Sequence, residues 1–465
     1  MFFRQFHLEA LGHASYLVGD EATGQALLLD PRRDIDGYLD TARMQGLRIS
    51  HALDSHGHND YLSGLVEVSA RTDAVILGSG EGRLGYDHRP VKDGETVELG
   101  AVAVRVLHTP GHTPEHLSLL VYDHQQGHEP ALLLSGGALL VGDLARPDLL
   151  GGDEEAREAA RSFCHTIQSK ILPLPDHVEV WPTHVAGSLC GGNIGSRLST
   201  TIGYERRTNA ILAEVDGKEE FVRECIRLDN LPAVPPYWRR MRAQNLAGVA
   251  LLGVLPEPPA LMPAAFAEAA EAPDAVILDI RQPEAFGGGH IPEAINAGLG
   301  SSFPTWAGTA LPGGARTLLV LDSPDQLPEV TWHLLRIGYP PPAGWLAGGM
   351  FAWRTAARNL ARLPQVSVHE LAGRLGDIGV LDVRQPAEWA AGHIEGAVFI
   401  TGAELPARFD EVPEGPLAVI CGSGYRSSVA ASIIARTGRD VVNVLGGMSA
   451  WTTAHLPTID PKENP

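Results

Sequence analysis

ISHALDSHGHND (residues 49–60) joins an apolar, strand-like run to three side chains that can bind a metal ion. His56, His58 and Asp60 follow the run directly, so we expect them on a loop at the end of a β-strand. Loops anchored at strand ends are where proteins usually display their chemistry. The stretch therefore predicts a functional loop on a mixed α/β framework.

Three further segments repeat this arrangement, each just after an apolar run. They contain His112 in HTPGHTPEH (108–116), Asp143 in LLVGDLARPDL (139–149) and His184 in VWPTH (180–184). Imidazole and carboxylate groups suit zinc or iron, and a divalent ion needs several such donors from distant parts of the chain. Any one of the 19 histidines alone is better explained as an ordinary surface or core residue. The ordered set of His and Asp positions nevertheless predicts a metal centre.

These motifs resemble the metallo-β-lactamase superfamily over roughly the first 240 residues, and HTPGHTPEH with GDLARPDL is most similar to its persulfide dioxygenase branch. The resemblance implies an αββα sandwich that binds one Fe(II) per chain. The implied iron ligands are His56, His112 and Asp143. The residues implied to orient them through hydrogen bonds are His58, Asp60 and His184. Two imidazoles and one carboxylate leave positions on Fe(II) open for dioxygen and a substrate sulfur.

Position 61 separates this sequence from the hydrolases of the superfamily. Their loop reads HxHxDH and its last histidine helps to hold a second metal, whereas this sequence has Tyr61 there. A phenol is a much poorer ligand than a neutral imidazole, because a proton with a pKa of about 10 must first be removed. One metal ion is therefore favoured over two, and oxygen chemistry over the hydrolysis of a glyoxalase II-like thioesterase.

Two polar residues beside the predicted ligands are candidate substrate contacts. Arg146 and Thr113 can bind the carboxylate or phosphate of a thiol cofactor. An ion pair for Arg146 and a turn cap for Thr113 explain the same residues equally well. Cys190, in GSLCGG, lies near the predicted site in sequence, but a lone cysteine is more often a small buried apolar residue, so we expect it to be structural.

The second half of the chain contains an internal repeat. LDIRQPEAFGGGHIPEAIN (278–296) recurs as LDVRQPAEWAAGHIEGAVF (381–399), and WLAGGMFAW (345–353) recurs as VLGGMSAW (444–451). Each copy alternates strand-like and helical segments, as expected of a small α/β domain with a parallel sheet. With a Pro-rich linker near 246–260, the sequence predicts three domains. Their expected bounds are 1–245, 256–360 and 364–460.

The last copy contains a candidate nucleophile in LAVICGSGYRSS (417–428). Cys421 starts a Gly-rich turn that leads into a predicted helix, and Arg426 follows five residues later. Backbone N–H groups at a helix N-terminus and a guanidinium both stabilise a thiolate. The loop resembles that of the rhodaneses, which implies that Cys421 accepts a sulfane sulfur with Arg426 beside it. The cradle would be formed by Gly422, Ser423, Gly424 and Tyr425.

The first copy has neither of these two groups. Aligning TLLVLDSPDQLPEV (317–330) with the Cys421 loop places Asp322 opposite Cys421 and Leu327 opposite Arg426. We therefore expect this copy to be an inactive rhodanese-like domain that packs against the others or supports a dimer, with a regulatory binding role left open. The Asp-x-Arg motif at the strand ends is expected to be structural in both copies. It comprises Asp279 and Arg281, and Asp382 and Arg384.

Charge and composition exclude several classes of partner. The formal charge of 36 − 56 = −20 repels nucleic acid and anionic membrane surfaces. The sequence has no signal-peptide pattern at its start and no apolar run near the length of a membrane span, so we expect a cytoplasmic protein. Four cysteines in 465 residues do not form a disulfide framework. We also expect a homo-oligomer.

The resemblances together imply a two-step sulfur chemistry. The first domain would use iron and O2 to oxidise glutathione persulfide, or a related thiol persulfide, to sulfite. Cys421 would pass sulfane sulfur to sulfite to form thiosulfate, or act in the reverse direction. Two alternatives stay open: a two-zinc thioester hydrolase fused to a sulfurtransferase, and a non-catalytic sulfur-carrier scaffold.

Overall fold

The computed structural model describes residues 1–227, 231–255 and 257–459 and divides the chain into two compact units. The first unit contains 1–231 and 238–253. The second contains 232–237 and 254–465. None of the helices in the described ranges is long and apolar enough to cross a bilayer.

The first unit is built on two six-stranded sheets. The first sheet has the order β1-β2-β3-β4-β5-β6, and the second has the order β12-β11-β10-β9-β8-β7. The first comprises β1 (Phe2–Leu8), β2 (His13–Asp20), β3 (Gln25–Leu29), β4 (Arg48–Leu53), β5 (Val75–Ser79) and β6 (Arg89–Val91). The second comprises β7 (Thr96–Glu98), β8 (Val102–His108), β9 (Leu117–Asp123), β10 (Pro130–Gly136), β11 (Glu179–Pro182) and β12 (Thr200–Thr201).

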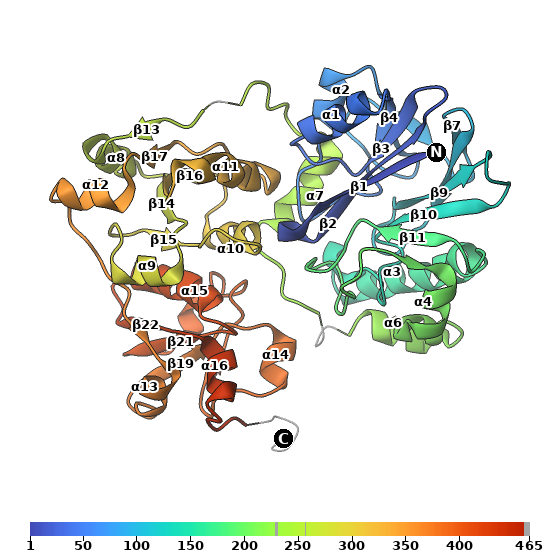
Figure 1. The fold of residues 1–465 in the computed structure, drawn as a ribbon. Helices are drawn as coiled ribbons and strands as arrows, with labels where there is room; N and C mark the ends of the chain where they lie inside the picture. The colour runs from blue at the N-terminus through green and yellow to red at the C-terminus, as the bar shows by residue number, and fades with distance from the viewer. Residues whose placement is uncertain (228–230, 256, 460–465) are drawn as a thin grey trace. The chain divides into compact units, whose positions relative to one another are not determined.

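Helices cover the outer faces of these sheets, and Figure 1 shows the resulting layers. On the first sheet lie α1 (Asp36–Met44) and α2 (Leu65–Arg71). On the second lie α3 (Asp153–Thr166), which continues into a π-helical turn (Ile167–Ile171), α4 (Ile202–Thr208), α5 (Ala210–Ala213) and α6 (Lys218–Cys225). The last helix of the unit is α7 (Trp238–Ala247). Short 3-10 turns occupy Glu9–Leu11 and Asp148–Leu150.

Alternation along the strands explains why both faces of each sheet are covered. In β2, Val18 points into the apolar core between the two sheets, whereas its neighbour Leu17 packs with the helices α1 and α2. In β9, Leu119 belongs to the core between the sheets and Leu120 packs towards α3 and α6. The first unit is therefore an αββα sandwich, which confirms the predicted fold class.

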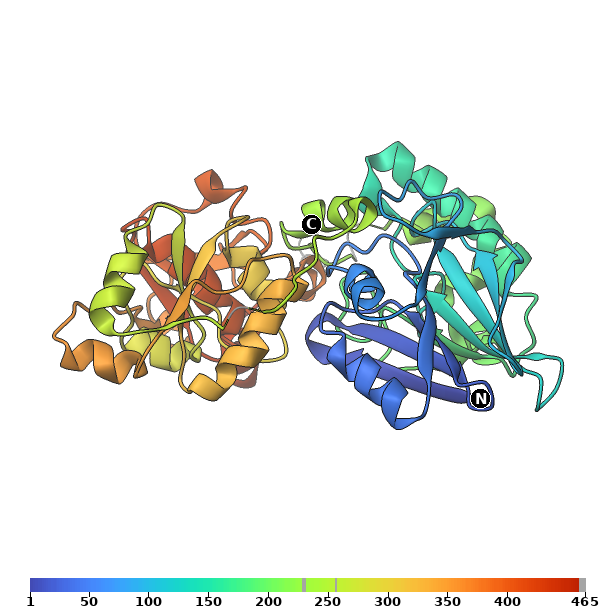
Figure 2. The ribbon, with the colours of Figure 1, turned by 90° about the horizontal axis from the view of Figure 1, so that it is seen from above.

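The second unit contains two copies of one parallel α/β fold. The first copy has the sheet order β13-β17-β16-β14-β15, and the second repeats it as β18-β22-β21-β19-β20. All strand pairs in both sheets are parallel, and helices flank each sheet (Figure 1, Figure 2). The identical strand order confirms the repeat predicted from the sequence.

The elements of the two copies also correspond one to one. The first contains β13 (Ala260–Leu261), α8 (Pro263–Ala270), β14 (Ala275–Asp279), α9 (Pro283–Gly288), β15 (Ile295–Asn296), α10 (Phe303–Ala310), β16 (Arg316–Val320), α11 (Leu327–Arg336), β17 (Gly344–Leu346) and α12 (Gly349–Thr355). The second contains β18 (Gln365–Val366), α13 (Val368–Ala372), β19 (Gly379–Asp382), α14 (Pro386–Ala390), β20 (Val398–Phe399), β21 (Leu417–Ile420), α15 (Tyr425–Ala435), β22 (Val441–Val444) and α16 (Gly447–Thr453). There are two exceptions. The counterpart of α10 is an irregular segment that ends in a 3-10 turn (Phe409–Glu411), and the 3-10 turn Pro324–Gln326 before α11 has no counterpart before α15.

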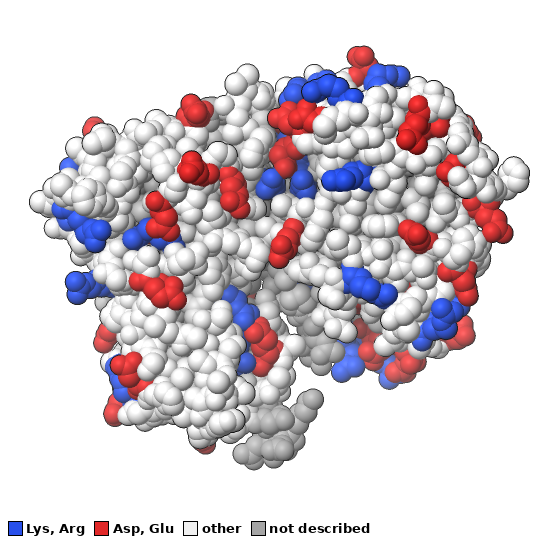
Figure 3. All heavy atoms as spheres, in the orientation of Figure 1, with Lys and Arg blue, Asp and Glu red and all other residues white. Residues whose placement is uncertain are grey.

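Charged side chains are mixed on the surface. On the face shown in Figure 3, Lys and Arg side chains lie singly or in small groups among Asp and Glu. No extended basic surface is visible on that face, in keeping with the net charge of −20.

Candidate metal centre and thiol loop

Three imidazoles from separate loops of the first unit meet in its interior. His56 follows β4, His112 follows β8 and His184 follows β11, and one ligand atom of each lies within 4.8 Å of those of the other two. All three side chains are buried. The carboxyl ends of strands that are far apart in sequence therefore bring these histidines together, as the metal-centre prediction requires.

The hydrogen bonds of these rings leave lone pairs inside the cluster. Nδ1 of His112 donates to the backbone oxygen of Arg146 at 2.8 Å, so Nε2 carries no proton on a neutral ring. That Nε2 atom is buried and has no hydrogen-bond partner within the described part of the chain. His56 contacts Ser55 Oγ through Nδ1 at 2.8 Å, and its Nε2 lies 3.3 Å from Nε2 of His184. Outer nitrogens fixed by partners, with inner nitrogens facing each other, are the arrangement that zinc and iron ligands adopt.

The electrostatics of the cluster also suit a bound cation. Burial lowers the pKa of His56 and of His112 well below the ordinary histidine value, and the neighbouring imidazoles lower it further. The rings therefore stay neutral, and a neutral imidazole is the form that binds a metal ion. The donor set present thus fits a divalent metal.

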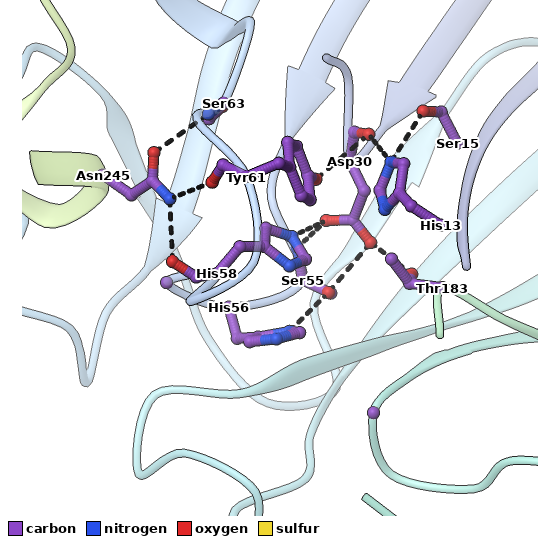
Figure 4. Close-up of polar contacts among 12 residues, drawn as sticks. His13, Ser15, Asp30, Ser55, His56, His58, Tyr61, Ser63, Thr183 and Asn245 are labelled. Atoms are coloured by element: carbon purple, nitrogen blue, oxygen red, sulfur yellow. Dashed lines mark hydrogen bonds and ion pairs between the residues drawn. The ribbon is translucent and has the colours of Figure 1, made fainter. Parts of the chain in front are cut away.

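Asp30, at the end of β3, connects the loops that carry these histidines (Figure 4). Its buried carboxylate accepts hydrogen bonds from Ser55 N at 2.6 Å, from Ser55 Oγ at 2.9 Å and from Thr183 Oγ1. Ser55 precedes His56, and Thr183 precedes His184. Asp30 adopts a left-handed φ of 53°, an unusual conformation for a residue other than glycine. It was not predicted from the sequence, although the run QALLLD (25–30) ends on it.

His58 and Asp60 lie beside the imidazole cluster. His58 Nε2 bonds to Asp30 Oδ1 at 2.9 Å, and its Nδ1 lies 3.9 Å from Asp60 Oδ1. Burial alone would lower the pKa of His58, but the charge and hydrogen bond of Asp30 outweigh it and raise that pKa. Asp60 Oδ2 lies 3.6 Å from Nδ1 of His184. His58 thus contacts Asp30, which binds the loops of His56 and His184, and Asp60 contacts the ring of His184 directly.

Asp143, the carboxylate ligand implied by the resemblance, is held by backbone hydrogen bonds. Its carboxylate is buried and accepts hydrogen bonds from the backbone N–H groups of Leu144 at 2.8 Å and Asn193 at 2.7 Å. Burial raises the pKa of this carboxyl. The structure groups His184, not Asp143, with His56 and His112 at 4.8 Å. The assignment of Asp143 as a ligand therefore stays a prediction, and His184 is a candidate ligand that the sequence suggested only as an orienting residue.

The contacts of Tyr61 make it a poor metal ligand. Its side chain is fully buried, its ring packs 4.1 Å from that of His13 and 4.6 Å from that of His58, and its hydroxyl donates to the backbone oxygen of Asp30 at 3.3 Å. Burial raises its pKa well above the ordinary tyrosine value, and nearby carboxylates raise it further. The phenol therefore keeps its proton.

Helix α7 clamps the loop that carries His56. Arg242 forms a two-pronged ion pair with Glu115, with N···O distances of 2.7 and 2.8 Å, and also donates to the backbone oxygen of Gly57 at 3.2 Å. Glu115 accepts in turn from the N–H of Gly57 at 2.9 Å. A Cβ atom at position 57 would lie 2.6 Å from the Arg242 guanidinium, so this close approach requires glycine.

Asn245, one turn further along α7, binds the same loop (Figure 4). Its Nδ2 donates to the backbone oxygens of His58 and Tyr61, each at 2.8 Å, and its Oδ1 accepts from the N–H of Ser63 at 2.9 Å. Neither Asn245 nor Arg242 was predicted, because both act on backbone atoms more than 180 positions earlier in the chain.

The candidate substrate contacts of the first unit are both buried. The Arg146 guanidinium pairs with the carboxylate of Asp148 through hydrogen bonds of 2.8 and 2.7 Å. Thr113 Oγ1 has no hydrogen-bond partner among the described residues. Cys190 is also buried, and its sulfur belongs to a second group of possible ligand atoms within 4.8 Å, with Asp60 and His184.

In the second unit, Cys421 starts the turn between β21 and α15. Its sulfur accepts the N–H of Gly424 at 3.2 Å, and Ser427 Oγ lies 3.4 Å away. Gly424 has a φ of 102°, a conformation that favours glycine, and is the N-cap of α15. The Tyr425 hydroxyl donates to the backbone oxygen of Gly298 in the first copy at 2.7 Å. One backbone N–H and one hydroxyl therefore face the sulfur of Cys421.

Arg426 lies across this loop and is paired with an acidic residue. Both of its terminal nitrogens donate to the carboxylate of Glu388, each at 2.6 Å. A Cβ atom at Gly422 would lie 2.8 Å from Arg426 Nη2, so the guanidinium closely covers the start of the loop. The structure gives no contact that assigns a role to Ser423.

Strand pairing establishes the alignment of the two copies. Val320 of β16 pairs with Asp279 of β14, and Ile420 of β21 pairs with Asp382 of β19. Asp279 and Asp382 are the same position of the repeat, so Val320 and Ile420 are equivalent as well.

The prediction that matched Cys421 with Asp322 is therefore wrong by one residue, and the equivalent of Cys421 is Leu321. A loop whose sequence differs between the copies does not define the register, whereas the hydrogen-bonded strands before it do. The match of Arg426 with Leu327 stays a prediction, and residues 321–330 of the first copy contain no cysteine or arginine. The first copy still has neither a thiol nor a guanidinium at these positions.

Comparison with known proteins agrees with this architecture. Rhodanese-like domains match residues 262–356 and 367–454. A metallo-β-lactamase structure from Staphylococcus aureus is 34% identical, covers 74% of this chain with 98% of its own, and superposes with a TM-score of 0.67.

Two relatives match shorter parts of this chain. A hydroxyacylglutathione hydrolase from Polaromonas is 34% identical over 37% of this chain and 61% of its own length. The persulfide dioxygenase ETHE1 from Bos taurus is 28% identical over 47% of this chain and 77% of its own length. The chain thus spans less than two thirds of that hydrolase. On these matches, the chain belongs to the metallo-β-lactamase superfamily and carries two rhodanese-like domains after its metallo-β-lactamase domain.

Proposed function

We propose that the first unit oxidises a low-molecular-weight thiol persulfide, such as glutathione persulfide, to sulfite with O2 and one Fe(II) per chain. We further propose that Cys421 transfers sulfane sulfur to or from thiosulfate. The observation that carries the first proposal is the buried imidazole cluster next to Tyr61, a protonated phenol where the hydrolases of the superfamily have a metal-binding histidine. This combination favours one metal ion over two.

The residues have separate tasks in this reaction. His56 and His112 would hold the iron through their inner nitrogens, with Asp143 as the carboxylate ligand that the family pattern implies. His58 and Asp60 would keep the rings oriented. Bound Fe(II) would supply open coordination positions for dioxygen and for the outer sulfur of the persulfide.

A small cavity of about 20 Å³ borders His56 and is lined in part by Ser79, Leu84 and Tyr86. Because the ligands are buried, water would be kept away from the reacting sulfur. Side reactions with water would then be prevented.

The chemistry of Cys421 conserves atoms and charge. The thiolate attacks the outer sulfur of a persulfide R–S–SH, the S–S bond breaks, and R–S⁻ leaves with the electron pair, which gives Cys–S–SH. After loss of the proton, sulfite attacks the outer sulfur, Cys–S⁻ leaves and thiosulfate forms. The N–H of Gly424 and the hydroxyl of Ser427 stabilise the anionic sulfur in both steps.

A two-zinc thioester hydrolase is the second candidate for the first unit. It is favoured by the second group of possible ligand atoms, on Asp60, His184 and Cys190, and by the similarity to a hydroxyacylglutathione hydrolase. It predicts two zinc ions per chain and hydrolysis of acyl-glutathione in the absence of oxygen.

One experiment separates these candidates. Protein purified without oxygen is analysed for metal, and oxygen uptake is followed with an electrode after glutathione persulfide is added. We expect one iron per chain and prompt, iron-dependent oxygen consumption with release of sulfite. Two zinc ions and anaerobic thioester hydrolysis would contradict the proposal. Unchanged sulfur turnover in His56→Ala and His112→Ala would instead support the scaffold alternative.

A further inference from the structure

The two rhodanese-like copies allow structural residues to be separated from active-site residues within one chain. The Asp-x-Arg motif is retained in both copies with the same contacts. Arg281 pairs with Asp279 and donates to the backbone oxygen of Gly289 at 3.0 Å. In the second copy, Arg384 pairs with Asp382 and donates to the backbone oxygen of Gly392 at 2.8 Å. Residues present in both copies thus maintain the fold.

Three polar residues of the second copy are replaced together in the first. Leu321 stands in place of Cys421, and the segment 321–330 that corresponds to the Cys421 loop contains no arginine. At the third position, the shared LD-x-R-Q-P segment aligns Glu388 with Ala285. Glu388 is therefore absent from the copy that has neither thiol nor guanidinium, although the surrounding fold is the same. This pattern associates Glu388 with the chemistry of the loop rather than with its fold.

The side chains of Glu388, Arg426 and Cys421 differ in their exposure to solvent. The side chain of Glu388 is 38% exposed and that of Arg426 is 19% exposed, while Cys421 is 0% exposed. A sulfur donor that approaches from solvent consequently meets the Glu388–Arg426 pair before the thiol.

The opposite charges of Glu388 and Arg426 cancel each other, so such a donor meets a pair without net charge. Two of the five N–H donors of Arg426 are committed to the Glu388 carboxylate, each at 2.6 Å. Burial alone would raise the pKa of Glu388, but the hydrogen bonds and charge of Arg426 outweigh it and hold that pKa below its ordinary value. Glu388 is therefore ionised at neutral pH. When Cys421 reacts as a thiolate, the three side chains together carry a net negative charge.

We propose that Glu388 is a specificity-determining residue: its carboxylate neutralises Arg426 and disfavours multiply charged sulfur donors at Cys421. This inference rests on the proposed sulfur transfer by Cys421. An anion of charge −2 is repelled by the Glu388 carboxylate twice as strongly as one of charge −1 at the same position. Glu388 thus favours sulfane sulfur carried on singly charged donors, such as deprotonated persulfides, over thiosulfate as the incoming donor.

Two donors of similar shape test this charge dependence. Thiosulfate, ⁻S–SO3⁻, gives its outer sulfur to the Cys421 thiolate as the S–S bond breaks and sulfite leaves with the electron pair. Methanethiosulfonate, CH3SO2–S⁻, gives the same Cys–S–S⁻ product and releases methanesulfinate. The first donor carries one more negative charge than the second. Cyanide then removes the transferred sulfur as thiocyanate and regenerates the thiolate, which provides a common assay.

The test variant is Glu388→Gln in the full chain. Glutamine can still accept the N–H of Gln385, which Glu388 Oε2 accepts at 3.0 Å, so this cap of α14 is kept. We expect KM for thiosulfate to fall about tenfold and KM for methanethiosulfonate about threefold, because the free-energy change scales with donor charge. Glu411→Gln is the matched control: Glu411 forms a comparable two-pronged pair with Arg408 in the same domain, and its loss should change neither KM.

A second measurement does not depend on turnover. The rate at which iodoacetate alkylates Cys421, divided by the rate with neutral iodoacetamide, reports the local charge. We expect this ratio to rise several-fold in Glu388→Gln and to stay unchanged in Glu411→Gln. Glu388→Ala provides the same test should the glutamine variant be poorly folded, because the first copy folds with Ala285 at the aligned position.

The outcomes distinguish the specificity inference from the proposed function. Equal KM changes for the two donors together with an unchanged alkylation ratio would show that Glu388 only supports the loop, and would overturn the specificity inference alone. Absence of thiocyanate from both donors in the wild-type chain would overturn the sulfur transfer itself. In that case a raised alkylation ratio would still show the electrostatic effect of Glu388 on the thiol.

Discussion

Replacing Asn245 by alanine should loosen the loop that carries His56 without touching a metal ligand. The substitution removes the partners of three buried backbone groups: the oxygens of His58 and Tyr61 and the N–H of Ser63. A buried polar group left without its partner costs about 1–3 kcal/mol. Because each carbonyl oxygen retains a second lone pair for water, the lower value applies, and the total is about 3 kcal/mol.

This cost should appear as weakened metal binding. Changes to groups that orient metal ligands lower metal affinity by about 10- to 100-fold, so the dissociation constant of Fe(II) should rise by that factor. The constant is measured without oxygen by competition with a coloured chelator. Hydrogen exchange of the amides between 57 and 63 should accelerate in the same variant, because α7 no longer holds them.

Val222→Ala is the matched control for a general loss of stability. Val222 is buried on α6 in the core beneath the second sheet, and its truncation costs about 2 kcal/mol. We expect this variant to unfold more readily but to bind iron with wild-type affinity. If Asn245→Ala changes neither the iron dissociation constant nor the exchange of the loop amides, the clamp does not position the metal loop and the argument is refuted.

Three further predictions concern the ligand set, the α7 ion pair and the two reactions. Asp143→Ala should lose the bound iron while His184→Ala retains about one ion per chain; the reverse result by elemental analysis would place His184 in the ligand set. Glu115→Gln should unfold with about 3 kcal/mol less free energy than the wild type at pH 7, because it breaks a buried pair. Burial would raise the pKa of Glu115, but Arg242 holds it below the ordinary value. The difference is therefore present above the ordinary carboxyl pKa of about 4.3 and should shrink as the pH falls through the lower folded value, whereas a difference that stays constant over this acid range would contradict this origin. Cys421→Ser should abolish thiosulfate formation while sulfite accumulates, and loss of both products would contradict independent sites.

Local patterns were sufficient to predict the fold of both units. The histidine-containing segments follow strands β4, β8 and β11 as expected, because short apolar runs bounded by turn residues define strands without reference to distant residues. The internal repeat likewise predicted two equivalent domains, and the strand orders confirm it. The register at the start of the thiol loop was misjudged by one residue, because the loop sequences of the two copies differ and only the strand pairing places Leu321 opposite Cys421.

The supporting contacts of the metal site were beyond prediction from sequence. Asp30 binds Ser55 and Thr183 across 25 and 153 positions, and Asn245 binds His58 across 187. Such bonds depend on how the sheets and α7 are arranged in space, and no local motif signals an acceptor so far away. The sequence did predict that His184 lies at the metal centre with the other two imidazoles, because each of these histidines follows an apolar, strand-like run.

The interleaving of the two units in sequence has a practical consequence for dissecting the protein. The chain leaves the first unit after residue 231, contributes 232–237 to the second, and returns as α7 and its tail up to 253. A protein ending at residue 231 would lack α7, which binds the loop of His56. One starting at 238 would begin at the first residue of α7 and would lack residues 232–237 of the second unit. Any single cleavage point therefore removes part of one unit, so excised fragments are poor substitutes for point variants in assigning the two activities.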